Sequence, residues 1–105
     1  AHLAAANVPD DTPIATTEGL REFSRAILGN EPELDITLAE RDNIEAAHQL
    51  ARQPDVGAII LECTNMAPYA AAISAATGLP VFSAYNFICW FQSGLMPAPF
   101  TGEIK

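Results

Sequence analysis

The sequence predicts an α/β fold, and two observations carry this prediction. Residues 56–61 form a continuous apolar run, the pattern of a parallel strand that is buried on both faces of its sheet. Segments with helical and strand-like patterns also alternate along the chain, as they do in parallel sheets with crossover helices. Because 105 residues suffice for one domain with a modest core, we expect residues 1–105 to form a single domain.

The first elements are a short strand and a helix. Residues 13–16 read as a candidate strand. Leu20, Phe23 and Ile27 then recur at i, i+3 and i+7, which indicates a helix with one apolar face. Gly29, followed by Asn, supplies its stop.

A second helix is predicted before Pro54. The stretch TLAE at residues 37–40 matches a capping box, in which side chains at the helix start bond to its free amides. Ile44, Ala47 and Ala51 share one apolar face. Pro54 ends the helix because it lacks the amide that a further turn requires.

The second half repeats the strand and helix order. After the strand at 56–61, residues 66–77 predict an alanine-rich helix that Gly78 closes. Residues 80–83 read as the next strand, and residues 85–93 as a last helix. The expected architecture is therefore a parallel sheet with flanking helices.

Charge and hydropathy exclude several classes of partner. Five Lys and Arg against thirteen Asp and Glu give a net charge of −8, which opposes binding to a phosphate backbone. No apolar run approaches the roughly 20 residues of a membrane span, and residues 1–6 lack the basic flank of a signal peptide. We expect a cytoplasmic protein that binds neither nucleic acid nor membrane.

The cysteines do not form a metal site. Cys63 and Cys89 are the two cysteines of the chain, without a CxxC pair and without a histidine at ligand spacing. We therefore predict no metal and two free thiols. Cys89 stands among apolar and aromatic residues, which favours a place in the core.

The turn after the strongest strand is the candidate site. In parallel sheets ligands bind beyond the carboxyl ends of strands, where Cys63 stands. If Thr64 or Asn65 caps the next helix, free amides there would attract a substrate carboxylate, a developing enolate or a thiolate. The competing interpretation is a small buried cysteine beside two capping residues, but Glu62 has no packing use at the end of an apolar strand.

Two stretches resemble a known family. The sequence ECTNMAPY at residues 62–69, followed by AATGLPVF at residues 75–82, is similar to the C-terminal half of the aspartate/glutamate racemase superfamily. That resemblance implies two similar α/β domains around a cleft, each giving one cysteine, and no cofactor. It further implies Cys63 as the acid/base group, Thr64 and Asn65 as binders of the substrate carboxylate, and Glu62 as their neighbour.

The implied function is a cofactor-independent racemase or isomerase that moves a proton at the carbon alpha to a carboxylate. Two alternatives stay open: a non-catalytic carboxylate-binding domain, or a related decarboxylase, hydantoin racemase or maleate isomerase chemistry. Racemases of the family carry Gly before this cysteine, whereas this chain has Glu62. The substrate is therefore specified only as a small carboxylate compound.

The resemblance also implies that parts are missing. Neither the opposing N-terminal domain nor the first strand of this domain has a counterpart in the sequence. We therefore expect an isolated chain that is inactive and that associates with itself or with the missing half. Residues 56–61 should then show an exposed apolar flank, and residues 82–100 should be the surface left uncovered.

Overall fold

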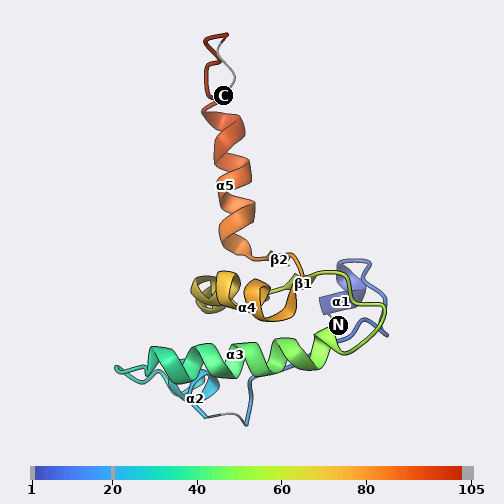
Figure 1. The fold of residues 1–105 in the computed structure, drawn as a ribbon, viewed down its shortest axis with the longest axis vertical. Coiled ribbons are helices and arrows are strands. Elements are labelled where there is room, and N and C mark those ends of the chain that lie inside the picture. The colour runs from blue at the N-terminus through green and yellow to red at the C-terminus, as the bar shows by residue number, and fades with distance from the viewer. Residues whose placement is uncertain (1, 20, 103–105) are drawn as a thin grey trace.

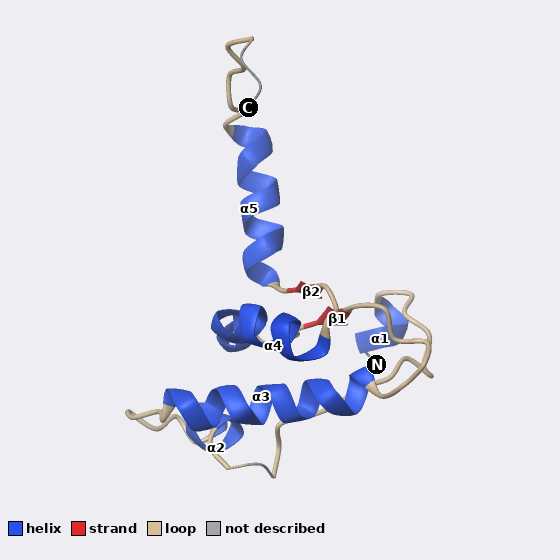
Figure 2. Ribbon diagram, viewed as in Figure 1, coloured by secondary structure: helices blue, strands red, loops and turns tan. Residues whose placement is uncertain are grey.

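A computed structural model describes residues 2–19 and 21–102 (Figures 1 and 2). Most of the helical and strand residues lie after residue 35. In chain order, the elements are α1 (His2–Ala5), α2 (Phe23–Leu28), α3 (Ile36–Ala51), β1 (Ile59–Ile60), the 3₁₀ helix η1 (Thr64–Tyr69), α4 (Ala70–Thr77), β2 (Val81–Phe82) and α5 (Ala84–Leu95).

The longest helix, α3, begins earlier than predicted. Its N-cap is Asp35, whose side chain accepts a hydrogen bond from the Leu38 amide at 3.1 Å, so the capping box expected at residues 37–40 is wrong. The chosen cap is physically equivalent, because a carboxylate two residues upstream satisfies a free amide equally well. The helix ends at Ala51, before Pro54, as predicted.

The sheet has the predicted direction but little length. β1 and β2 pair in parallel, with Ile59 opposite Val81 and Ile60 opposite Phe82, and α4 connects them. The α/β class is thus confirmed in its general form. Each strand has only two residues, and the segment expected as a strand at residues 13–16 is irregular chain. Its failure has a simple cause, since Pro13 has no amide to donate to a ladder and the Ile14 side chain is 72% exposed.

α2 confirms the predicted stop but not the predicted start. The helix begins at Phe23 and its last residue is followed by Gly29 and by Asn30 in the left-handed conformation, with φ of 51°. Leu20, which belonged to the predicted apolar repeat, lies outside the described residues.

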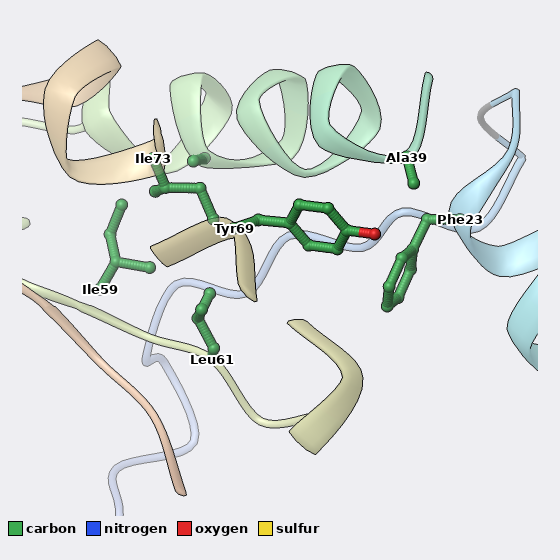
Figure 3. Close-up of a cluster of buried hydrophobic side chains, with 7 residues drawn as sticks. Phe23, Ala39, Ile59, Leu61, Tyr69 and Ile73 are labelled. Carbon is green, nitrogen blue, oxygen red and sulfur yellow. The ribbon is translucent and has the colours of Figure 1, made fainter. Parts of the chain in front are cut away.

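One hydrophobic cluster joins the sheet to the helices (Figure 3). Ile59 and Leu61 project from β1 and its extension toward Ile73 of α4 and Tyr69 of η1. Phe23 closes the far end, with its ring edge-on to Tyr69 at a centroid distance of 6.0 Å and an interplanar angle of 86°. The core therefore holds the end of η1 and the end of β1 in fixed relation.

A buried carboxylate attaches α2 to α3. Asp42 of α3 is fully buried and accepts hydrogen bonds from the backbone amides of Arg21, Glu22 and Phe23, the residues at which α2 starts. Burial raises the pKa of Asp42, but the three amides and the Arg21 guanidinium outweigh it and hold the pKa below its ordinary value. Glu22 in turn accepts from the Asp35 amide at 2.8 Å. Two carboxylates thus satisfy amides at the starts of both helices.

The last helix stands apart from this core. Figure 1 shows α5 projecting away from α3 and α4, and no residue of α5 is buried. The molecule is accordingly 52 Å long, with a radius of gyration of 16.5 Å where about 13 Å is usual for this chain length. Within the part of the chain that the structure describes, no helix is both long enough and apolar enough to cross a membrane.

The uncovered surfaces match two expectations. Ile60 is 78% exposed and Phe82 is 53% exposed, so one face of the small sheet is bare. The aromatic residues between Phe82 and Phe100 are exposed as well. Both the apolar flank predicted at residues 56–61 and the uncovered surface predicted at 82–100 are confirmed.

Candidate functional site

Cys63 lies at the junction between the sheet and the following helix. It is the N-cap of η1, with extended backbone angles of φ −84° and ψ 131°, so the cap predicted at Thr64 or Asn65 is wrong by one or two residues. The first helical bond runs from the Met66 amide to the Cys63 carbonyl at 3.0 Å. The amides of Thr64 and Asn65 precede that bond, so neither has an acceptor within η1.

The turn has an apolar side and a polar side. Cys63 is half-buried and packs against the hydrophobic core, whereas Glu62, Thr64 and Asn65 are exposed. The core contact restrains the position of the thiol. Glu62, Cys63, Thr64 and Asn65 are thus consecutive residues of one turn, and their joint role in binding an anion stays a prediction.

The helix after the thiol starts as a tight 3₁₀ turn and not as an α-helix. Residues 66–77 were predicted as one α-helix, but α4 begins only at Ala70. Pro68 lies inside η1, two residues after the first hydrogen-bonded amide, so its missing amide interrupts the hydrogen bonds of the turn shortly before α4 begins. The Gly78 stop is confirmed, with φ of 73° in the left-handed region.

A serine beyond β2 shares this edge of the sheet. Ser83 is buried and follows β2 directly, so the parallel register places it beside the stretch that leads from β1 to Cys63. Its backbone amide donates to Oδ1 of Asn86 at 2.9 Å, which fixes the start of α5. Sequence reasoning missed Ser83 and Asn86. Cys63 was predicted because ligands bind beyond the carboxyl ends of parallel strands. The same rule, applied to the strand that ends at Phe82, would have pointed to Ser83 and Asn86.

Cys89 does not occupy the core. It lies on α5 with its side chain exposed, so the prediction of a core thiol is wrong, while both cysteines are free thiols as predicted. Apolar neighbours along the sequence indicate burial only when a second element covers the helix, and the described residues provide no such element around Cys89.

Two shallow grooves lie away from the Cys63 turn. One, of about 380 Å³, follows α3 and is lined by Arg21, Arg41, Arg52 and His48. The other, of about 400 Å³, lies along the end of α5. Neither contains Cys63. We place the candidate site at the thiol because a nucleophilic atom and backbone amides without intrahelical acceptors follow one another there, whereas the two grooves are open surfaces.

The chain was compared with known proteins. No family model matches it, and no solved structure does. It is similar to a dimethylsulfoniopropionate lyase from Durusdinium sp. clade D, with 36% identity over 79 residues that cover 74% of this chain and 26% of that protein. It is also similar to dimethylsulfoniopropionate lyase 6 of Emiliania huxleyi (strain CCMP1516), with 32% identity over 97 residues, 87% of this chain and 25% of that protein. The chain spans about a quarter of the length of these curated relatives.

These relatives correct the functional expectation. Both are named as lyases, so the assignment to the aspartate/glutamate racemase superfamily and the racemase or isomerase activity are wrong. The two alternatives, a non-catalytic carboxylate-binding domain and a related decarboxylase, hydantoin racemase or maleate isomerase chemistry, are not supported either. The error has a chemical origin, because a thiol followed by free backbone amides suits any reaction that begins with proton removal next to a carboxylate. A match that covers 74% of the chain must include its middle, and therefore Cys63, wherever the match begins. The candidate site thus lies in the segment that is similar to two dimethylsulfoniopropionate lyases.

Proposed function

We propose that this chain carries one part of the active site of a lyase that acts on dimethylsulfoniopropionate, with Cys63 as the base. The observation that supports the proposal most directly is the similarity to two lyases of that name over a segment that includes Cys63. Because the matched segments are only about a quarter of those proteins, the proposal concerns a contribution to the site and leaves the other groups to the remainder of a longer enzyme.

The substrate named by these relatives sets the chemistry. Dimethylsulfoniopropionate has a carboxylate on one end of a two-carbon chain and a dimethylsulfonium cation on the other. A base that removes a proton from the carbon next to the carboxylate leaves an electron pair, which forms the carbon–carbon double bond. The carbon–sulfur bond breaks with its electrons on sulfur. The products are acrylate, dimethyl sulfide and a proton on the base.

The residues of the turn fit three tasks in this step. The Cys63 thiolate would accept the proton. The amides of Thr64 and Asn65 would bind the carboxylate and stabilise the negative charge that develops on it during proton removal. Glu62, adjacent to the thiol in sequence, supplies the negative charge that a sulfonium cation prefers. Glu62 would therefore attract a substrate that carries a sulfonium cation, whereas it would repel a substrate that carries only carboxylates.

We also propose that the protein is cytoplasmic. Two free thiols, one of them exposed, suit a reducing compartment such as the cytoplasm.

A segment exchange tests the role of Cys63. Residues 1–105 would replace the matching segment of the Durusdinium lyase, and release of dimethyl sulfide from dimethylsulfoniopropionate would be measured by gas chromatography. We expect Cys63→Ser to reduce release at least about 100-fold, the usual minimum for loss of a general base. Cys89→Ser, the matched control, should leave it unchanged. Full activity of the Cys63→Ser protein would refute the proposal.

Thiol labelling of the chain itself gives an answer even if the exchanged protein does not fold. By exposure alone, iodoacetamide should modify the exposed Cys89 faster than the half-buried Cys63. An activated Cys63 reverses this order, and dimethylsulfoniopropionate or acrylate should slow its labelling without affecting Cys89. Slow Cys63 labelling that neither compound changes would count against the proposal.

A further inference from the structure

The helix α5 exposes an apolar surface as large as the largest patch of a typical monomeric protein. Its four aromatic side chains, Tyr85, Phe87, Trp90 and Phe91, are between 56% and 70% exposed. With about 200 Å² for each ring system, they present roughly 500 Å² to solvent. That value alone equals the largest apolar patch of a typical monomer, roughly 300–600 Å².

The apolar side chains of α5 are concentrated on one face. Ala84, Phe87, Ile88, Phe91 and Leu95 follow at i, i+3, i+4, i+7 and i+11, the spacing of a helix that packs against another helix. The opposite face carries the polar residues Asn86 and Ser93 and the thiol of Cys89, and Trp90 lies at its border beside Phe87. We call the first set the α5 stripe.

The charge distribution indicates what can cover the stripe. No Asp, Glu, Lys or Arg occurs from Cys63 to Gly102, so the whole net charge of −8 resides in residues 1–62. Two copies that met through α3 or α2 would bring like charges together. Two copies that met through α5 would join uncharged surfaces, and because α5 projects away from α3, an antiparallel pair would keep the acidic parts at opposite ends (Figure 1).

We propose that the α5 stripe is a self-association surface, on which the α5 helices of two copies of this chain pack antiparallel around a twofold axis. Such an interface is self-complementary, since each stripe meets an identical one. The stripe side chains Phe87, Ile88, Phe91 and Leu95 are between 56% and 67% exposed, so the pairing would remove four large apolar side chains of each copy from water. This inference is independent of the proposed function.

Sedimentation velocity over a wide range of concentration tests the proposal. The mass should rise from the monomer value of 11.2 kDa to a plateau at twice that value. Added salt should strengthen the association, because it screens repulsion between the acidic parts and has no ion pair at the interface to weaken. A single mass of one chain at all concentrations would overturn the proposal, as would continuous growth beyond two copies.

Paired variants locate the interface. Phe87→Gln with Phe91→Gln should keep the protein monomeric without unfolding it, since neither residue is buried in the core. The matched control is Leu28→Gln, at a side chain of α2 that is 71% exposed, and it should leave association unchanged. The fluorescence of Trp90, which lies 6.2 Å from Phe87 between ring centroids, should shift to shorter wavelength on dimerisation. A dimer that persists in the Phe87 and Phe91 variant would assign the interface elsewhere and refute the proposal.

Discussion

Replacing the buried Asp42 carboxylate by an amide should cost a large share of the stability of the protein. Asp42→Asn keeps the shape of the side chain but removes the charge and turns a hydrogen-bond donor toward backbone amides. Three amides, those of Arg21, Glu22 and Phe23, donate to this carboxylate in the native structure. Hydrogen bonds to a charged group contribute about 1.5–3 kcal/mol each, and one oxygen acceptor survives, so we expect a loss of about 2–4 kcal/mol.

Urea denaturation followed by circular dichroism measures this loss. The control is Asp55→Asn, the same substitution at an exposed position, which should change the free energy of unfolding by less than about 0.5 kcal/mol. An effect of Asp42→Asn as small as that of the control would refute the assignment of Asp42 as the link between α2 and α3.

The pH dependence of the same variant provides an independent check. Because the folded-state pKa of Asp42 lies below its ordinary value of 3.8, the carboxylate contributes stability that is present above pH 3.8. That contribution is lost as the pH falls through the lower folded-state pKa. The difference between the native protein and Asp42→Asn should therefore shrink in acid, and a difference that stays constant would contradict the charge-based explanation.

Three further changes test the core and its boundaries. Ile73→Ala should lower the free energy of unfolding by about 2–5 kcal/mol, since Ile73 is fully buried, whereas Ile60→Ala at a side chain that is 78% exposed should have little effect; equal losses would contradict the core assignment. Gly78→Ala should cost about 1 kcal/mol, because φ is +73° and a Cβ there meets no atom within 4 Å, so a much larger loss would indicate a clash instead. Burial of Tyr69, and to a lesser extent the charge of Glu40, raises the pKa of its hydroxyl above the ordinary value of 10.0. The stability that the neutral hydroxyl contributes is present below pH 10 and should fall as the pH rises through the folded-state pKa. An absorbance titration of Tyr69 that gave the ordinary pKa would refute this.

Local patterns in the sequence predicted those parts of the fold that depend on neighbours along the chain. Pro54 and Gly78 mark the ends of two helices because each acts on its own backbone, and both ends are found where they were expected. The direction of the strand pair followed from the helix between them. The strand expected at residues 13–16 failed because pairing requires a partner that no local pattern reveals.

Likewise, some features of the candidate site follow from neighbours along the chain and others depend on distant elements. The position of Cys63 in the turn after β1 is a local property and was predicted, while the burial of Ser83 beside the stretch that leads from β1 to Cys63 depends on the register between two strands. Cys89 shows the converse limit. Its apolar neighbours indicated a core that would have to come from another element, and the described residues place it on an exposed helix. Cys63 and the amides after it do not distinguish racemisation from the proposed elimination, because both reactions begin with the same proton transfer.

The central place of α3 has a consequence for how the folded state opens. α3 contacts α2, η1 and α4, so its amides can exchange with solvent deuterium only when most of the structure unfolds. α5 has 12 residues and no buried side chain, and isolated helices of about this length are marginal in water. Hydrogen exchange should therefore be slowest in α3 and fastest in α5 at low protein concentration, where the last helix opens and closes many times for each opening of the core.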